Sequence, residues 1–325
     1  MPIFLPFLGC TQKCIFCAQH AQTGIADVPA AVLLQRLRQQ LDERIARQAP
    51  PVELGFFGGT FTCMPTEVVQ ECIDVVGEYR RKGAVVAARC STRPDAVNPA
   101  LLQTLRAGAF TTVELGVQSF DTGALEQAHR GYDGLCARRA CQWVREAGLQ
   151  VGVQLLPGMP GVQPHIFMND VTTALASGAD FLRFYPCLVI SGTKLAEMWQ
   201  MGTYSPWELE TTIDFLAQGY ALALEKSVPV IRMGLAPEKS LLPQILDGPQ
   251  HPALGSMVQG LALVRAAERA LQGRRVRGVS VPRSCQGFFW GHRQALRPRW
   301  AALGVGSELI HWDDTANAEH CCFSF

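Results

Sequence analysis

The sequence predicts an α/β fold: a partial (β/α)6-type TIM barrel followed by a smaller C-terminal α/β extension. Short apolar runs alternate with helix-patterned stretches through the first two thirds of the 325 residues. The apolar runs are nearly continuous, as expected for parallel strands that are covered on both faces. Glycines separate the helical stretches from the runs that follow them. An open, doubly wound sheet is the competing arrangement.

Six apolar runs are expected to form strands, and a helix is expected after each of the first five. The runs cover residues 3–9, 52–59, 84–93, 111–119, 149–158 and 181–190. The helical patterns cover residues 29–47, 65–82, 98–107, 121–147 and 164–177. The glycines at the predicted helix ends, where a C-cap glycine is common, are Gly83, Gly108, Gly148 and Gly178.

The pattern changes near residue 204, so we divide the chain into a core domain, 1–203, and a C-terminal extension, 204–325. In the extension, one amphipathic helix is expected to begin with Ser205 as N-cap and Pro206 in the first position. The remaining expected elements are a further strand at 228–235, a helix at 251–271, and late strands at 276–282 and 307–312.

The composition is that of a chain with a sizeable core, since 48% of its residues are hydrophobic. The net charge of +1 says nothing about polyanionic partners. The N-terminal stretch MPIFLPFLG has no basic region typical of a signal peptide, and no apolar run reaches the roughly 18 residues of a membrane helix. We therefore expect a cytoplasmic protein without membrane association, in which clustered cysteines are ligands rather than disulfides.

Three of the twelve cysteines lie in the stretch GCTQKCIFCAQH, at Cys10, Cys14 and Cys17. Three cysteines in one loop are hard to pack as core residues. Structural zinc normally takes four ligands, often two cysteine pairs or cysteines with a histidine. His20 could be the fourth ligand, but the chain has no second cysteine pair with suitable spacing. Ferredoxin-type clusters also use four cysteines. Three cysteine ligands would leave one iron of a cluster without a protein ligand. The spacing therefore suggests a cluster whose open iron binds a substrate or cofactor directly.

Glycines and polar residues follow the other predicted strands as well. The segments are GGTF at 58–61, STRPD at 91–95, QS at 118–119 and LPGMPG at 156–161. The carboxyl ends of barrel strands meet at one rim, where active sites gather. The sequence therefore predicts a single site at that rim, which includes the cysteine loop.

The spacing Cys-x3-Cys-x-aromatic-Cys, with Phe16 as the aromatic residue, resembles the signature of radical S-adenosylmethionine (SAM) enzymes. The resemblance implies that the three cysteines hold a [4Fe-4S] cluster whose open iron chelates the amino and carboxylate groups of SAM. The reduced cluster would cleave SAM to methionine and a 5′-deoxyadenosyl radical, which abstracts a hydrogen atom. The resemblance also implies that the protein is sensitive to oxygen and needs a reductant such as flavodoxin or ferredoxin.

The same resemblance suggests contacts for SAM. Gly58, Gly59 and Thr60 resemble the glycine motif that contacts the SAM amino group through backbone, and glycine permits such a close approach. Glu114 and Gln118 lie where the superfamily places groups for the ribose hydroxyls and the carboxylate of SAM.

Further contacts are implied by similarity to oxygen-independent coproporphyrinogen III oxidases. Arg130, in HRGYD, lies where those enzymes carry an arginine for the SAM carboxylate, and a guanidinium fork suits a carboxylate. A salt bridge at a helix terminus is the structural alternative. Ser91 stands in place of a carboxylate and Gln154 in place of an aspartate, so these two contacts depart from the pattern. Leu156 lies in LLPGMPG, which resembles the adenine-contacting motif or forms a simple turn.

Longer segments resemble the radical-SAM half of the Elongator catalytic subunit over about residues 3–260. They are GVQSF, HRGYD, LLPGMPG, RFYPCLVISGTKLAEMWQMGTYSPW and IRMGLAPEKSL…GPQHPALGSMV. That subunit modifies the wobble uridine of tRNA, using acetyl-CoA through a second, acetyltransferase domain. About 65 residues follow the matched region, which is too few for such a domain.

The expected function is therefore a radical SAM enzyme that acts on a tRNA nucleoside without an acetyltransferase step. One alternative is a radical SAM enzyme acting on a small molecule such as a tetrapyrrole. An alternative of another class is a non-catalytic metal- or cluster-binding protein.

An arginine-rich segment between residues 265 and 299 bears on the substrate. It has a net charge of +8, which leaves −7 on the rest of the chain. Its arginines are Arg265, Arg269, Arg274, Arg275, Arg277, Arg283, Arg293, Arg297 and Arg299, and its interleaved aromatics are Phe288, Phe289, Trp290 and Trp300. Arginines with stacking rings suit phosphates and unpaired bases, so a nucleic acid is the expected partner, and the resemblance to the Elongator subunit implies tRNA. A solvated helix face over buried aromatics is the alternative. Cys321 and Cys322 receive no role.

Overall fold

The computed structural model describes residues 1–10, 14–24, 28–235, 239–271, 274, 276–315 and 322–324. Within these residues, a seven-stranded sheet has the order β1-β2-β3-β4-β5-β6-β8, and all neighbouring strands are parallel. The strands are β1 (Pro2–Phe4), β2 (Val52–Phe57), β3 (Val85–Thr92), β4 (Phe110–Gln118), β5 (Gln150–Leu155), β6 (Phe181–Phe184) and β8 (Val230–Met233). The strands follow one another in chain order, whereas a doubly wound sheet reverses its order. The predicted partial barrel is confirmed.

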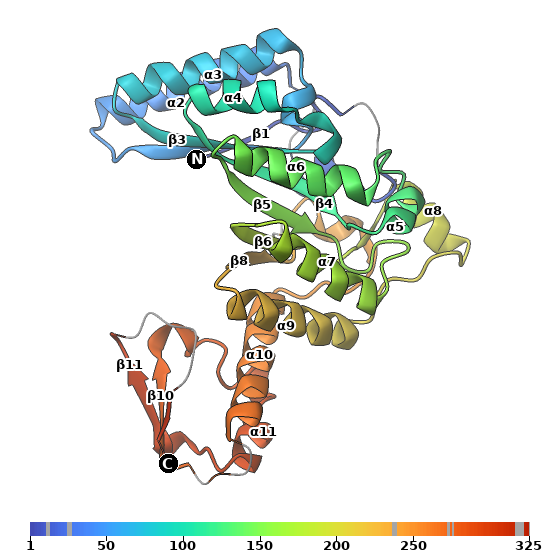
Figure 1. Ribbon diagram of the computed structural model, residues 1–325, viewed down its shortest axis with the longest axis vertical. Helices are drawn as coiled ribbons and strands as arrows, with labels where there is room; N and C mark the ends of the chain where they lie inside the picture. Colours follow the sequence, from blue (N-terminus) through green and yellow to red (C-terminus); the bar gives the residue numbers. More distant parts are fainter. Residues whose placement is uncertain are drawn as a thin grey trace.

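Helices connect the strands and pack against the sheet (Figure 1). They are α2 (Ala30–Ala46), α3 (Thr66–Arg81), α4 (Pro99–Ala107), α5 (Thr122–Gln127), α6 (Gly134–Glu146) and α7 (Pro164–Ala176). The single helix expected at 121–147 is wrong. His129 and Gly131 have φ angles of 52° and 75° in the turn between α5 and α6, which a continuous helix does not allow. This interruption places Arg130 at the rim of the sheet rather than on a helix face.

The glycines at the helix ends follow the expectation with one exception. Gly83, Gly148 and Gly178 adopt φ angles of 75°, 71° and 78°, as left-handed C-terminal residues do. Gly108 has a φ of −80°, and the next residue, Ala109, takes the positive value of 66°. Close packing rather than a positive φ explains why residue 108 is a glycine, because a Cβ atom there would lie 2.5 Å from Ile73 Cγ2.

The first part of the extension packs against the barrel. Helix α9 (Leu209–Glu225) contacts α7 and α10 (Leu254–Leu271). The predicted helix start at Ser205 is wrong, since α9 begins at Leu209. Tyr204 is buried and donates a hydrogen bond to Gly158 O at 2.7 Å, and the Trp207 ring packs edge-on against Phe167. These anchors keep residues 204–208 out of the helix.

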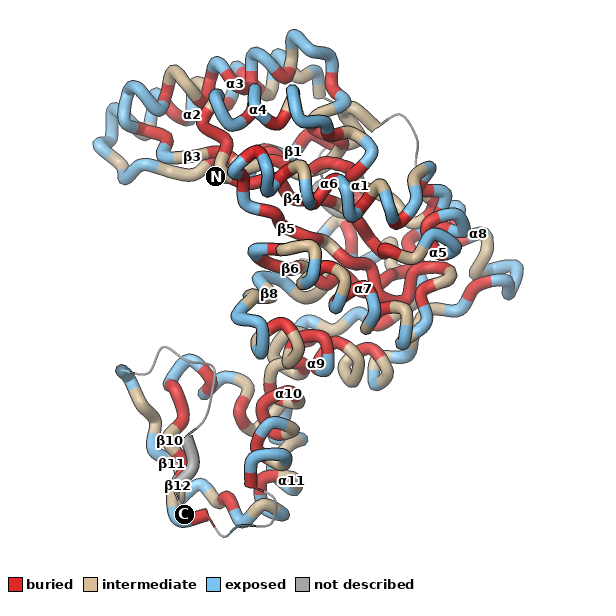
Figure 2. Tube along the Cα trace, viewed as in Figure 1, coloured by how far each residue is buried: buried red, intermediate tan, exposed pale blue. Residues whose placement is uncertain are grey.

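A second hydrophobic cluster begins at Leu263, one residue after the barrel cluster reaches Ala262 in α10. At its centre, the buried rings of Phe289 and Trp300 stack with centroids 4.2 Å apart. The elements around it are α10, β10 (Gly278–Pro282), α11 (Arg297–Ala302), β11 (Ile310–Asp313) and β12 (Cys322–Ser324). Figure 2 shows buried positions along both parts of α10, so this helix belongs to both clusters. The domain division after residue 203 stays a prediction.

Smaller elements complete the described chain: α1 (Gln19–Thr23), β7 (Val189–Ile190), α8 (Lys194–Gln200) and β9 (Ile245–Asp247). Strands β7 and β9 pair antiparallel and form a separate two-stranded sheet. Within the described parts of the chain, no helix combines the length and apolar character needed to cross a bilayer.

Candidate active site

A cavity of about 470 Å³ lies at the carboxyl ends of the parallel strands. Every residue that the sequence analysis assigned to the cluster or to SAM lines this cavity. They are Cys10, Cys14, Phe16, Cys17, Gly58, Gly59, Thr60, Ser91, Glu114, Gln118, Arg130, Gln154 and Leu156. The fold thus brings together residues that are up to 146 positions apart. Their roles in binding stay predictions.

The three cysteines carry free thiols at one wall of the cavity. Cys10 Sγ lies 3.4 Å from Thr60 Oγ1, and the Cys17 N–H donates to Cys14 O at 3.1 Å. Burial raises the pKa of the Cys17 thiol to about 12, and the neighbouring Cys14 and Cys10 thiols act in the same direction. At neutral pH the Cys17 thiol therefore keeps its proton in this structure.

The glycine motif after β2 packs directly on the chain that leads into the cysteine loop. Gly59 has a φ of 41°, and a Cβ atom there would lie 2.1 Å from Leu8 O. Its N–H donates to Gln19 Oε1 at 2.8 Å, and the Thr60 N–H donates to Leu8 O at 2.8 Å. The motif therefore holds Leu8 and Gln19, which flank the cysteine segment, against the barrel, and this close packing sterically requires a glycine.

We expect Gly59→Ala to destabilise the protein far more than Gly83→Ala, by about 3 kcal/mol against about 1 kcal/mol. Both glycines have positive φ, but a Cβ atom at Gly83 meets nothing within 4 Å. The control therefore measures backbone strain alone, and the difference measures the clash with Leu8. Urea unfolding of the metal-free proteins gives both values; equal losses would contradict the close packing of Gly59.

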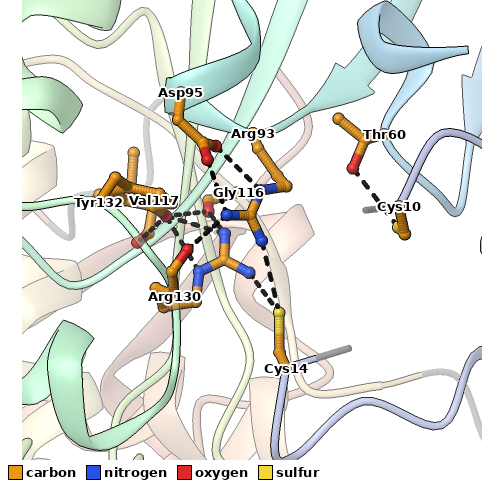
Figure 3. A network of polar contacts seen from close by, with 9 residues as sticks. All are labelled: Cys10, Cys14, Thr60, Arg93, Asp95, Gly116, Val117, Arg130 and Tyr132. Carbon is orange, nitrogen blue, oxygen red and sulfur yellow. Dashed lines mark hydrogen bonds and ion pairs between the residues drawn. The ribbon is translucent and has the colours of Figure 1, made fainter. Parts of the chain in front are cut away.

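Arg130 is buried and points its guanidinium at Cys14 (Figure 3). Its Nη1 donates to Cys14 Sγ at 2.8 Å, and its Nη2 donates to Gly116 O at 2.6 Å. Tyr132 Oη accepts from both Nε and Nη2, at 3.1 and 2.8 Å. These partners are a thiol, a carbonyl and a phenol, so the alternative of a helix-terminal salt bridge is wrong.

Arg93, which the sequence analysis did not select, also faces Cys14 (Figure 3). Its Nε and Nη2 bind the Asp95 carboxylate at 2.9 and 2.8 Å, and its Nη1 lies 3.9 Å from Cys14 Sγ. It also donates to the Arg130 carbonyl. The STRPD segment contained a signal for Arg93, because an arginine two residues before an aspartate at a strand end can bind that carboxylate with two nitrogens.

Glu114 is held by two arginines from neighbouring parts of the sheet. Its carboxylate lies 3.0 Å from Arg183 Nε and 3.3 Å from Arg89 Nη1. Burial raises the pKa of Glu114, while the two guanidinium groups act in the opposite direction. Part of its hydrogen-bonding capacity is therefore used within the protein, which the sequence analysis did not anticipate.

The end of β4 is shaped by an unusual backbone conformation. Gln118 is a non-glycine residue with a φ of 68°, next to an irregularity in the pairing of β4 with β5. Its carbonyl accepts from the Leu156 N–H at 2.9 Å, and its Oε1 accepts from Gln154 Nε2 at 3.4 Å. Left-handed non-glycine residues cost free energy and cluster at functional sites.

A buried carboxylate, Asp170, holds the loop that follows Gln118. It accepts hydrogen bonds from Ser119 Oγ and from the Phe120 N–H, both at 2.7 Å. Burial raises the pKa of Asp170 to about 7, against the effect of both hydrogen bonds. The conformation of the rim after β4 therefore depends on a group that titrates near neutral pH.

We expect the wild type to lose stability, relative to Asp170→Asn, as the pH rises from about 4 to about 7. An unfolded aspartate has a pKa of about 3.9, so in this range the folded state binds the proton that the unfolded state has released. The contribution is fully present below the unfolded pKa and is lost as the pH rises through the folded pKa. Urea unfolding near pH 5 and near pH 8 measures it; a difference between the two proteins that is independent of pH would contradict the raised pKa.

Comparisons with known proteins identify the family. A model of the radical SAM superfamily matches residues 4–173, and a model of the radical SAM C-terminal domain matches residues 179–261. The first match covers more than half of the chain, which therefore belongs to the radical SAM superfamily. Members of this superfamily are enzymes that use a [4Fe-4S] cluster and SAM, and they need a reductant.

Curated relatives confirm the resemblance to the Elongator subunit. The tRNA uridine(34) acetyltransferase of Methanocaldococcus infernus is 29% identical, over 76% of this chain and 52% of its own length. Elongator complex protein 3 of Drosophila melanogaster is 25% identical, over 77% of this chain and 47% of its own. The chain thus spans about half the length of the curated relatives that it matches.

Solved structures agree with these relatives. The archaeal Elp3 of Methanocaldococcus infernus, with an N-terminal deletion, matches with a TM-score of 0.59 at 25% identity, over 76% of this chain and 62% of that chain. Coproporphyrinogen III oxidase from Escherichia coli matches with a TM-score of 0.51 at 17% identity, over 69% of this chain and 52% of that chain, which shows a common fold.

Proposed function

We propose that Cys10, Cys14 and Cys17 hold a [4Fe-4S] cluster beside a SAM site, and that the cavity performs radical chemistry on a substrate. The observation that carries this proposal is the meeting of three free thiols with a buried guanidinium at 2.8 Å from Cys14 Sγ. When bound and reduced by an external electron donor, the cluster would supply the electron that cleaves SAM to methionine and a 5′-deoxyadenosyl radical, which would take a hydrogen atom from the substrate.

The residues present fit these groups in charge and in hydrogen bonding. Three cysteine thiolates bring negative charge, and the guanidinium groups of Arg130 and Arg93 next to Cys14 compensate it. The fork of Arg130 is suited to a carboxylate such as that of SAM. The SAM amino group needs hydrogen-bond acceptors, and the backbone carbonyls of Gly58 and Gly59, which line the cavity, would supply them. The Gly59 N–H already donates to Gln19.

The experiment that tests this proposal measures 5′-deoxyadenosine. Protein reconstituted without oxygen and reduced with dithionite is mixed with SAM, and the product is quantified by chromatography. We expect 5′-deoxyadenosine to form, and to form faster when the substrate is present. Failure to release it, in protein whose cluster is complete and to which SAM does not bind, would refute the proposal.

We further propose a tRNA nucleoside as the substrate. The curated relative from Methanocaldococcus infernus is named as a tRNA uridine(34) acetyltransferase, and part of the arginine-rich segment is available for a polyanion. Arg293 and Arg297 are exposed, and the Arg297 guanidinium lies 4.8 Å from the centroid of the half-buried Trp290 ring. An arginine stacked on an indole suits an unpaired base and its phosphate.

Fewer side chains of the arginine-rich segment are free to bind a nucleic acid than its composition indicated. Acids from inside and outside the segment pair with three of its arginines, in Arg265–Asp214, Arg283–Asp314 and Arg299–Glu268. Phe289 and Trp300 are buried, so they cannot stack on a base, whereas Phe288 and Trp290 are half-buried. Arg275 and Cys321 lie outside the described residues, and so does the side chain of Cys322.

We expect Arg293→Ala/Arg297→Ala to weaken tRNA retention by about ten-fold at low salt, because two phosphate contacts are lost. The matched control is Arg265→Ala/Arg299→Ala, which removes two arginines that are already paired with carboxylates and should have the smaller effect. Filter binding at several salt concentrations measures both. If the two double variants are equally impaired, charge alone rather than this surface explains binding.

A small-molecule substrate, such as a tetrapyrrole, is the second candidate. The chain shares its fold with coproporphyrinogen III oxidase, and this likeness concerns the fold alone. No retention of tRNA by the wild type would favour the small-molecule substrate. The non-catalytic alternative is not supported, because members of the superfamily are enzymes. A flavodoxin or ferredoxin as the reductant, and a cytoplasmic location, stay predictions.

A further inference from the structure

Arg183 and Arg232 lie side by side on the last two strands of the sheet. Their positions on β6 and β8 are in register, and these strands are neighbours in Figure 1. Registered residues on neighbouring parallel strands project from the same face of a sheet. Both residues line the cavity that contains the three cysteines. None of the functions described above uses Arg232.

Charges alternate along the row of side chains that leads to this pair. Glu53 of β2 lies 2.7 Å from Arg89 of β3, which lies 3.3 Å from Glu114 of β4. Glu114 in turn lies 3.0 Å from Arg183 of β6. Each of these charges thus has an opposite charge beside it, which is how partly buried charges are stabilised.

Arg232 ends the row with a second positive charge next to the first. Among the described residues it has no carboxylate partner; its Nε donates to Gly234 O at 3.4 Å, and its side chain is exposed. Arg183 is fixed more firmly. Its Nη1 donates to Tyr185 Oη at 3.1 Å, and its guanidinium lies 5.5 Å from the centroid of the Phe57 ring. An anion beside Arg232 would continue the alternation of charge.

We propose that Arg232, next to the fixed guanidinium of Arg183, binds an anionic group of the substrate at the β6–β8 edge of the cavity. The group is a phosphate or a carboxylate, since both present the paired oxygens that a guanidinium fork binds. This proposal rests on the proposed function, because the substrate must enter the cavity. A nucleotide would bring the phosphate, and a tetrapyrrole would bring the carboxylate.

Equilibrium binding to the cluster-loaded chain, with SAM and without reductant, tests the site. Isothermal titration calorimetry compares two pairs of probes: uridine 5′-monophosphate with uridine, and coproporphyrin III with its methyl ester. We expect the anion of one pair to bind about ten-fold more tightly than its neutral partner. Arg232→Gln should reduce that preference to about unity, and Arg232→Lys should retain part of it. The pair that shows the preference identifies the source of the anion.

Arg138→Gln is the matched control, because Arg138 is an exposed arginine of α6 that does not line the cavity. It should keep the full preference. Equal binding of anionic and neutral probes by the wild type in both pairs would overturn the proposal, and so would a preference that survives Arg232→Gln. No radical chemistry occurs in this experiment. A failure of SAM cleavage would therefore refute the proposed function separately, without changing the outcome here.

Discussion

Cys14→Ala is expected to abolish both the iron–sulfur cluster and the formation of 5′-deoxyadenosine. A [4Fe-4S] cluster held by three thiolates loses a third of its protein ligands in this variant. It also loses the thiol that faces the guanidinium groups of Arg130 and Arg93. Iron and sulfide should fall to near zero after anaerobic reconstitution, and 5′-deoxyadenosine should fall by about a thousand-fold or more, as losses of essential groups do.

The chain offers a matched control in Cys63→Ala. Cys63 is an exposed thiol that follows the glycine motif, but it does not line the cavity. This variant should bind a full complement of iron and sulfide and should release 5′-deoxyadenosine at the wild-type rate. A Cys14→Ala protein that keeps four irons per chain would refute the assignment of the cluster ligands. A zinc content near one per chain, without iron, would refute the cluster itself.

Arg130→Lys should lower kcat/KM for SAM cleavage by about a hundred-fold, which corresponds to about 2.7 kcal/mol. A lysine keeps the charge but cannot reproduce the fork, so it cannot serve Cys14, Gly116 and Tyr132 together and also face a carboxylate. Removal of one partner from a buried charged group costs several kcal/mol. The effect should appear mainly as weaker SAM binding, measured by equilibrium titration of the reconstituted protein.

Two measurements separate this loss from a general disturbance. Arg138→Lys makes the same exchange at an exposed position of α6 and should leave SAM binding unchanged. The iron content of Arg130→Lys should stay at the wild-type level, since all three cysteines remain. An Arg130→Lys protein with normal SAM affinity would show that Arg130 only positions Cys14.

The sequence by itself determined the order of the elements and predicted a set of site residues that all line one cavity. Apolar runs, helical patterns and glycines at helix ends are local signals, so they located most of the strands and helices within a few residues. Two strand predictions were wrong in extent: the run at 3–9 forms a strand only at Pro2–Phe4, and the run at 181–190 forms β6 and the separate strand β7, which pairs with β9. The assigned site residues all line one cavity because they lie at strand ends, and a parallel sheet collects its strand ends at one rim. The family resemblance rested on short motifs and was confirmed by the comparisons.

Only the tertiary structure decided how these residues are paired. The break between α5 and α6, the start of α9 and the burial of Phe289 and Trp300 depend on contacts between distant segments. Arg93 and Arg183 were missed for the same reason. Arg183 pairs with Glu114, which is 69 positions away in the sequence, and Arg93 contacts Cys14, which is 79 positions away. Composition counts charges, but the distance between them sets their energy, and only the fold fixes that distance.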